Sequence, residues 1–281
     1  MSSLVDLHSH SSVSDGSERP EVVVRKAAAA GVRFLALTDH DGTGGLDEAI
    51  ATAAQLDGLE LIPGVELSAE EGIHVLGYFL AYHDAELQRT LSHLQEGREG
   101  RAHQILERLA ELGMPLDFER VKRIADGAIG RPHVARAMLE RGYVQSFNEA
   151  FERWLGIDRP AYIPSEKLSA EQAIEIIRDA GGVASWAHPE WPDGPQRYRP
   201  TEDTLRQLAD AGLQGIEVYY ADHLPDMTGR FLDLARRFDL VPTGGSDYHG
   251  PEVRAVELGS VLVPEETVDR LRSLSHHDGR G

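Results

Sequence analysis

The chain has 281 residues, a formal net charge of −19, thirteen histidines and no cysteine. This length allows one large core, or a core with a modest insertion, and the acidic balance argues against a broad basic surface for duplex DNA. Without cysteine, disulfides, thiolate metal sites and cysteine nucleophiles are excluded, so imidazole and carboxylate groups are the available metal ligands.

The first predicted element is the short strand LVDL at residues 4–7, which His8 and His10 follow. In a strand, residues i and i+2 point to the same face, so both imidazoles project together, with Asp15 on the next loop. This arrangement suits a metal site better than an apolar core. Polar residues also interrupt the N-terminal apolar stretch, and no apolar run reaches the roughly 20 residues of a bilayer span. We therefore expect a cytoplasmic protein without a signal peptide or membrane contact.

Strands and helices alternate along the next part of the chain. The predicted elements are helix 21–30, strand 32–38, helix 44–56 and strands 59–67 and 73–80. His40 comes at the end of the second strand, and Glu66 lies late in the third. His74 instead stands at the start of the fourth strand, which an antiparallel or a tightly returning fourth strand would explain.

The stretch from residue 98 to residue 167 departs from this alternation. It predicts successive helices at about 98–112, 117–125, 131–141 and 146–154. It carries 12 Lys and Arg against 11 Asp and Glu, whereas the rest of the chain carries 16 against 36. We interpret it as an inserted helical cap, which divides the chain into barrel residues 1–97, cap residues 98–167 and barrel residues 168–281. Such an arginine-rich insert either faces an anionic ligand or is an ordinary solvated helical hairpin.

The alternation resumes after the cap. The predicted elements are helix 169–180, strand 182–187, helix 201–211, strand 215–220, helix 226–238 and strand 240–245. His188 follows the first of these strands, and Asp247 and His249 follow the last. About seven strands with interleaved helices are typical of a parallel α/β barrel or a doubly wound sheet. In barrels of this kind, polar residues at the carboxyl ends of the strands form the functional site.

Four motifs carry a family resemblance: DLHSHSSVSDG, LTDHDG, AHP and SDYHG. Together they resemble the PHP (polymerase and histidinol phosphatase) superfamily of metal-dependent phosphoesterases, over nearly the whole chain. The resemblance implies an α/β fold, a distorted (β/α)7 barrel, with a trinuclear metal centre. Within the superfamily the chain is most similar to the stand-alone branch whose members act as nucleoside 3′,5′-bisphosphate phosphatases and as 5′-to-3′ exoribonucleases on short RNA.

The resemblance also implies which residues bind two to three divalent ions. The first ion would take His8, His10, Glu66 and Asp247; the second would share Glu66 and add His74 and His188; the third would use Asp15, His40 and His249. Many superfamily members have a histidine where Asp15 stands, so this aspartate favours the nucleotide-phosphatase branch. Harder ligands favour Mn²⁺, with Fe or Zn as alternatives.

Such a centre predicts an enzyme, a metal-dependent phosphoric ester hydrolase. Because cations lower the pKa of bound water, a hydroxide bridging the ions would attack phosphorus, and no protein nucleophile is needed. Bridging by Glu66 would let two cations approach each other. Asp247 is the candidate to orient the water or to take its proton.

Three further residues are candidates for substrate contacts. Arg131 and His133 belong to the motif GRPH at the predicted start of a cap helix, where exposed amides favour an anion, and the resemblance points to the same place. His223 follows the strand at 215–220, and we expect it to contact the phosphate or the leaving group, or to lie in a surface loop. Asp39 is either a partner of a metal ligand or a hydrogen-bond acceptor for the loop.

The predicted function is hydrolysis of the 3′-phosphate of nucleoside 3′,5′-bisphosphates, cleavage of short RNA from its 5′ end, or both. The expected partner is thus a small phosphorylated substrate, with no obligate protein partner. Alternatives are a histidinol-phosphate phosphatase or another small phosphomonoesterase, an amidohydrolase, and a non-catalytic metal-binding module. Many amidohydrolases use a carboxylated lysine, and no lysine stands at a predicted strand end here; the complete ligand set argues against the non-catalytic module.

Overall fold

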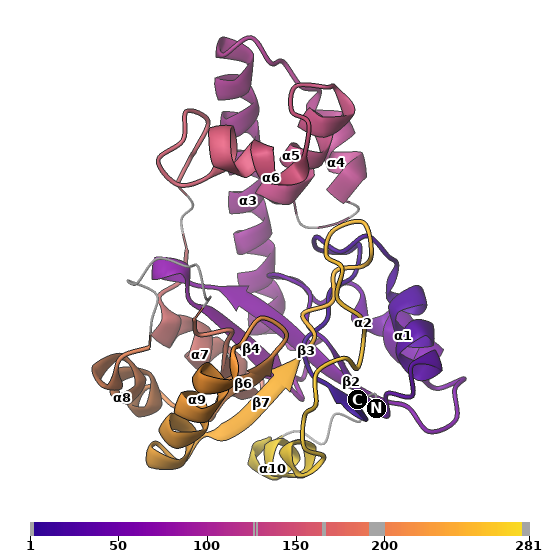
Figure 1. The fold of residues 1–281 in the computed structure, drawn as a ribbon, viewed down its shortest axis with the longest axis vertical. Coiled ribbons are helices and arrows are strands. Elements are labelled where there is room, and N and C mark those ends of the chain that lie inside the picture. Colours follow the sequence, from indigo (N-terminus) through magenta and orange to yellow (C-terminus); the bar gives the residue numbers. More distant parts are fainter. Residues whose placement is uncertain (1–2, 126, 128, 165–166, 191–199, 277–281) are drawn as a thin grey trace.

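The computed structural model describes residues 3–125, 127, 129–164, 167–190 and 200–276, which form a barrel with a helical cap above it (Figure 1). Seven strands pair in chain order. They are β1 Val5–Asp6, β2 Phe34–Leu37, β3 Glu60–Ser68, β4 His74–Tyr78, β5 Val183–Ala187, β6 Gly215–Tyr220 and β7 Val241–Gly245. The backbone N–H of Leu7 donates to the carbonyl oxygen of Gly244 at 3.1 Å. This bond joins the first and last strands and nearly closes the barrel.

One strand runs against the others. Neighbouring strands are parallel except that β4 is antiparallel to both β3 and β5, which confirms the expected reversal. His74, the first residue of β4, pairs with Ser68 of β3 and Ala187 of β5. Because of the reversal, the amino end of β4 lies beside the carboxyl ends of its neighbours. His74 therefore reaches the end of the barrel where the other polar residues lie.

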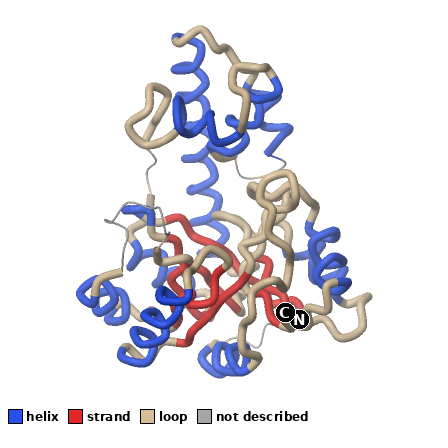
Figure 2. The backbone as a smooth tube through the Cα atoms, in the orientation of Figure 1, coloured by secondary structure: helices blue, strands red, loops and turns tan. Residues whose placement is uncertain are grey.

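Helices cover the outside of the strands (Figure 2). The barrel helices are α1 Pro20–Ala29, α2 Leu46–Ala53, α7 Ala170–Asp179, α8 Glu202–Asp210, α9 Pro225–Arg237 and α10 Glu266–Leu274, and the short 3₁₀ helix η1 Glu70–Gly72 precedes β4. Local sequence explains some of the boundaries: Pro20 fits the first turn of α1, and Ser169 and Gln172 form a capping box at the start of α7. The seven-stranded α/β barrel confirms the predicted fold class.

A single long helix connects the barrel to the cap. Helix α3, Ala85–Glu111, is 27 residues long; it buries Leu87 and Leu91 in the barrel and Ile105 and Leu109 in the cap. The cap is completed by α4 Phe118–Ala125, α5 Arg131–Glu140, α6 Phe147–Ala150 and the π-helical turn η2 Phe151–Leu155. Apolar residues of these elements form a hydrophobic cluster distinct from those of the barrel.

Two helical predictions differ from the structure, and one helix was not predicted. The helix predicted from residue 98 begins at Ala85, because packing at both of its ends outweighs the weak helix propensity of Gly97. The helix predicted at 146–154 is divided into α6 and the π-helical turn. No element was predicted for α10, which packs against the barrel interior through Leu271.

None of the helices in the described part of the chain combines the length and the apolar character needed to cross a membrane.

Candidate metal centre

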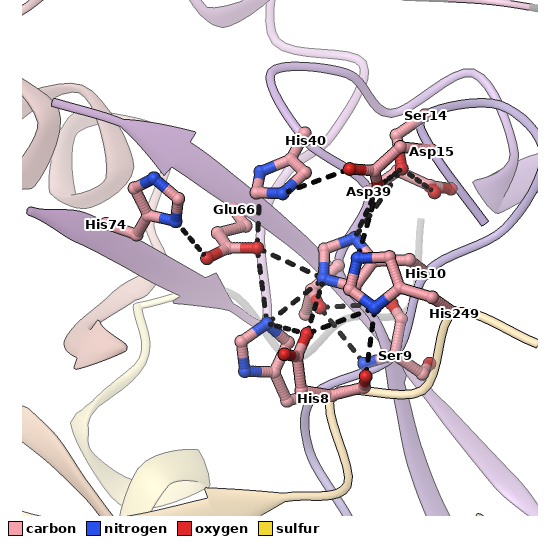
Figure 3. Close-up of polar contacts among 12 residues, drawn as sticks. His8, Ser9, His10, Ser14, Asp15, Asp39, His40, Glu66, His74 and His249 are labelled. Carbon is pink, nitrogen blue, oxygen red and sulfur yellow. Dashed lines mark hydrogen bonds and ion pairs between the residues drawn. The ribbon is translucent and has the colours of Figure 1, made fainter. Parts of the chain in front are cut away.

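The nine predicted metal ligands lie together at one end of the barrel, and Figure 3 shows most of them. They come from segments far apart in the chain. His8 and His10 follow β1, Asp15 lies in the next loop, His40 follows β2, Glu66 lies in β3, His74 begins β4, His188 follows β5, and Asp247 and His249 follow β7.

Glu66 lies in the middle of the cluster, and its two carboxylate oxygens face different histidines. Oε2 lies 3.2 Å from Nε2 of His8 and 3.1 Å from Nε2 of His10. Oε1 lies 2.8 Å from Nδ1 of His74 and 3.1 Å from Nε2 of His188. A single carboxylate is thus placed between two sets of nitrogen donors.

Asp247 presents one oxygen to the cluster and the other to its surroundings. Oδ1 lies 3.3 Å from Nε2 of His8 and 3.3 Å from Nε2 of His10. Oδ2 accepts hydrogen bonds from the hydroxyl of Tyr220 at 2.9 Å and from Nη1 of Arg254 at 2.5 Å. These two donors fix the carboxylate so that Oδ1 faces the histidines.

A third group of donors surrounds Asp15. Its Oδ1 lies 3.2 Å from Nε2 of His249, and its Oδ2 lies 3.8 Å from Nε2 of His40. Together with His10, these residues offer four ligand atoms that all lie within 4.8 Å of one another. Because His10 also faces Glu66 through its other nitrogen, the donor groups form one continuous cluster.

The donor set fits divalent metal ions. Nε2 of His8 and Nε2 of His10 are 3.1 Å apart, and a cation stabilises imidazole nitrogens that face each other beside carboxylates. Nδ1 of His40 is buried and lies 3.3 Å from Oε2 of Glu66, but it makes no hydrogen bond with any described residue. Buried polar atoms are normally satisfied, so an unsatisfied nitrogen among imidazole and carboxylate donors indicates a metal ligand.

Burial and neighbouring charges set the protonation of the cluster. Burial lowers the pKa of His40 to about 3, so this ring is neutral at neutral pH. Burial alone would raise the pKa of Asp247, but the charges of His8 and His249 outweigh it and hold that pKa well below its usual value. Nearby carboxylates raise the pKa of His8 well above its usual value despite burial, so a metal would displace its proton, because neutral imidazole and ionised carboxylate are the forms that bind metals.

Asp39 fixes the loop that carries Asp15 (Figure 3). Its carboxylate accepts hydrogen bonds from the backbone N–H of Ser11 at 2.8 Å, from the hydroxyl of Ser11 at 2.7 Å and from the hydroxyl of Ser14 at 2.6 Å. Asp39 therefore has the second of its two expected roles, that of a hydrogen-bond acceptor for the loop. They tie the loop after β1 to the end of β2.

The ring of Tyr220 lies between His223 and the metal-ligand cluster. Its ring centroid is 5.1 Å from that of Tyr220, which in turn is 5.5 Å from that of His188. Nδ1 lies 2.9 Å from the carbonyl oxygen of Val218, and Nε2 is buried without a hydrogen-bond partner in the described part of the chain. A carbonyl only accepts, so Nδ1 carries the hydrogen and Nε2 is an acceptor in the neutral ring.

The other two predicted substrate residues lie in the first turn of α5, in the cap. Nδ1 of His133 accepts the backbone N–H of Gly130 at 2.9 Å, a contact that caps the helix. Arg131 donates to the carbonyl oxygen of Leu155 at 3.1 Å, and its guanidinium lies over the ring of Tyr162.

Cations that the sequence did not single out lie near Arg131, where the cap meets the barrel. Burial and the charge of Arg131 lower the pKa of Arg101 to about 10. Burial and the charge of Arg98 lower the pKa of Lys167 to about 8. Arg98 also pairs with Asp41, immediately after His40 in the chain, so this cationic group is connected to the metal-ligand cluster. The arginine-rich composition of the cap was the only signal for it in the sequence.

Sequence reasoning also missed residues that hold the ligands. Arg254 bonds to Asp247 from seven residues further along the chain, and no motif marks it. Glu217 lies 3.1 Å from Nδ1 of His8. It was detectable in principle, because it is an acidic residue in the otherwise uncharged strand GIEVYY.

The comparisons with known proteins agree with this geometry. The chain matches the PHP domain family over residues 6–155. It is 36% identical over 269 residues to a 5′-3′ exoribonuclease of Haemophilus influenzae, covering 93% of this chain and 95% of that protein. It is 36% identical over 252 residues to the 3′,5′-nucleoside bisphosphate phosphatase of Chromobacterium violaceum, covering 88% of this chain and 87% of that protein.

A solved structure from Bifidobacterium adolescentis, described as a metal-dependent phosphoesterase, has the same fold. It is 30% identical in sequence, matches with a TM-score of 0.90 and covers 96% of each chain. The similarity therefore includes the cap as well as the barrel.

Proposed function

Because the chain belongs to the PHP domain family and is a metal-dependent phosphoester hydrolase, we propose that its substrates are nucleoside 3′,5′-bisphosphates and short RNA. It would remove the 3′-phosphate from the bisphosphate and release nucleotides from the 5′ end of RNA. The observation that carries the proposal is the buried ligand cluster in which the two oxygens of Glu66 face separate sets of histidines.

We assign two to three Mn²⁺ ions to this cluster. The proposed ligands are His8, His10, Asp15, His40, Glu66, His74, His188, Asp247 and His249. When bound, the ions supply Lewis-acid stabilisation of the phosphoryl oxygens and lower the pKa of water. A set of nitrogen and oxygen donors without thiolate supports Mn²⁺, with Fe and Zn as the alternatives.

Asp247 is proposed to orient the attacking water rather than to take its proton. Tyr220 and Arg254 hold its Oδ2, which leaves Oδ1 in a fixed direction. Hydrogen bonds from the hydroxyl of Tyr220 and from the guanidinium of Arg254 favour the ionised form, so the carboxylate is a weak base at neutral pH. Attack of water on phosphorus then breaks the bond between phosphorus and the ribose oxygen; the water gives its proton to solvent, and the leaving oxygen takes one from solvent to become the ribose hydroxyl.

His223 is proposed to contact the substrate through Nε2. Burial lowers its pKa, so the ring is neutral, with its hydrogen on Nδ1. An acceptor nitrogen suits a hydroxyl group of the substrate and does not suit a phosphate oxygen. Of the two substrate contacts expected from the sequence, the phosphate and the leaving group, this proposal favours the leaving group.

The cationic group at the edge of the cap is proposed to bind the phosphate that is not hydrolysed. Arg131 can clasp a phosphate through two parallel hydrogen bonds, which a lysine cannot reproduce. Burial and, after it, the charges of neighbouring arginines lower the pKa values of Arg101 and Lys167, and a bound anion would offset both effects. A substrate with two phosphates would use both the metal centre and this group. The capping contact of His133 leaves a direct substrate contact as a prediction only.

The test is a comparison of kcat/KM for Mn²⁺-loaded protein with adenosine 3′,5′-bisphosphate, AMP, histidinol phosphate and a short 5′-phosphorylated RNA. We expect the bisphosphate and the RNA to be preferred over both monoesters. Equal or faster turnover of histidinol phosphate would overturn the substrate assignment and leave the phosphoesterase assignment intact.

A further inference from the structure

Glu217 is a fully buried carboxylate that is neither a proposed metal ligand nor a proposed catalytic residue. Its neighbours in β6, Ile216 and Val218, pack in the hydrophobic cluster with the helices. Because side chains alternate along a strand, Glu217 projects to the opposite face, into the barrel. A buried charge is costly unless it is paired and hydrogen-bonded, so its partners indicate what it does.

Within the described part of the chain, both hydrogen-bond partners of Glu217 are proposed metal ligands. Its Oε1 lies 3.1 Å from Nδ1 of His8. Its Oε2 accepts the backbone N–H of His188 at 2.6 Å. These two histidines face different oxygens of Glu66, so Glu217 contacts one member of each donor set.

The contact with His8 determines which nitrogen of that ring can bind a metal. Nε2 of His8 faces Glu66 and Asp247. A neutral imidazole has one N–H, and a carboxylate can only accept a hydrogen bond. The hydrogen of neutral His8 therefore lies on Nδ1, where Glu217 accepts it, and the lone pair of Nε2 points into the cluster.

The contact with His188 stabilises an unusual backbone. His188 has a φ of +26°, a region that residues other than glycine rarely occupy. Its N–H is held by Glu217, and in this conformation its Nε2 lies 3.1 Å from Oε1 of Glu66. The same carboxylate thus fixes a side chain of one set and a backbone of the other.

We propose that Glu217 is a positioning residue of the metal centre, which fixes His8 and His188 so that both rings present Nε2 to the ions. The proposal rests on the metal centre assigned above. Mutation of a hydrogen-bonded partner of a metal-binding histidine commonly weakens metal affinity, or lowers activity, by about 10- to 100-fold.

Glu217→Gln tests this role without changing the shape of the side chain. The amide has one acceptor oxygen, which can serve either His188 or His8 but not both. If it accepts the N–H of His188, the amide NH₂ faces Nδ1 of His8, and only an unprotonated Nδ1 can accept it. The hydrogen then moves to Nε2, and the lone pair is lost to the metal.

The first measurement is the dissociation constant of Mn²⁺, by competition with a chelator. We expect Glu217→Gln to bind about 10- to 100-fold more weakly than the wild type. Ser185→Ala is the matched control: Ser185 is fully buried in β5, and its described hydrogen bond goes to Thr243 at 2.8 Å. This variant loses a buried hydrogen bond in the same barrel interior, and its affinity should stay close to the wild-type value.

The second measurement does not depend on the folding of any Glu217 variant. In ¹⁵N NMR spectra of Zn²⁺-loaded wild type, with the His8 signals assigned by their loss in His8→Gln, Nδ1 should carry the hydrogen. An Nδ1 without hydrogen would overturn the proposal, as would Mn²⁺ affinity in Glu217→Gln equal to that of the wild type. A wild-type protein that bound no Mn²⁺ would instead overturn the proposed metal centre.

Discussion

Glu66 connects the two sets of histidines through its separate oxygens, so a change at this residue affects both. Glu66→Gln keeps the shape of the side chain but removes its charge and one acceptor oxygen. We expect it to lose bound metal and activity together, measured by elemental analysis and by phosphate release. His223→Ala is the comparison variant and should retain the metal content while losing rate or affinity. Full metal occupancy and full turnover in Glu66→Gln would contradict the bridging role.

Tyr220 is predicted to act on catalysis through Asp247. Tyr220→Phe removes one of the two donors that hold Oδ2, so the carboxylate becomes less well fixed. We expect kcat to fall about tenfold, the size of one lost hydrogen bond to a charged group, with unchanged metal content. Tyr219→Phe is the control, because Tyr219 packs against the hydrophobic clusters. An equal fall in kcat in both variants would show that the effect is not specific to the Asp247 contact.

At the scale of elements, helix α5 brings Arg131 to the cationic group at the cap edge. Arg131→Ala should reduce kcat/KM for the bisphosphate roughly a hundredfold. This corresponds to a loss of about 3 kcal/mol in transition-state stabilisation, the cost of removing one charged donor from such a site. Arg141→Ala, at the exposed far end of α5, should leave it unchanged. Steady-state kinetics with the bisphosphate and AMP will separate the two phosphate sites. An unaffected Arg131→Ala would remove the cap from the mechanism.

The segment that returns from the cap to the barrel carries Lys167, and its protonation gives a pH dependence. Burial lowers the pKa of Lys167 to about 8, so its positive charge is present below that pH and is lost above it. KM for the bisphosphate should therefore increase as the pH rises through about 8. Lys167→Gln should have a higher KM throughout and a flatter profile, as measured in a pH series. An identical pH profile in wild type and variant would exclude Lys167 from substrate binding.

The strands and the nine proposed ligands could be predicted because each is encoded locally. His8 and His10 follow a recognisable strand, and the antiparallel β4 explains the position of His74. The residues that hold the ligands could not be placed in this way. Glu217 contacts His8 across 209 positions in the chain, and the sequence near each residue does not indicate that the other lies beside it.

The long helix α3 shows the corresponding limit for secondary structure. The sequence predicts that the helix begins at about residue 98, just after Gly97, a residue of weak helix propensity, yet it extends from Ala85 to Glu111. Its first part packs in the barrel and its last part packs in the cap. Tertiary packing at both ends, which a local window does not contain, decides the outcome.

At the scale of the whole molecule, charge is distributed unevenly between the barrel and the cap. The chain outside residues 98–167 carries 16 Lys and Arg against 36 Asp and Glu, a distribution that repels nucleotides at long range. Attraction must therefore be local, from bound ions and from the cationic group that includes Arg101 and Lys167. This division explains why the cap, rather than the barrel surface, is the expected place for the second phosphate.

The metal centre also connects the two ends of the chain, because its proposed ligands extend from His8 to His249. The unfolded chain has no such site, so the ions bind the native state and stabilise it by mass action. One site contributes about 2.7 kcal/mol when free Mn²⁺ is 100 times its Kd, and each kcal/mol raises Tm by roughly 2–4 °C in a domain of 150–250 residues. We expect Tm to rise with Mn²⁺ concentration and to fall on chelation, with a smaller rise in Glu66→Gln. Calorimetry with parallel elemental analysis should find two to three ions per chain; a Tm independent of Mn²⁺, or one ion or none per chain, would contradict the multinuclear centre.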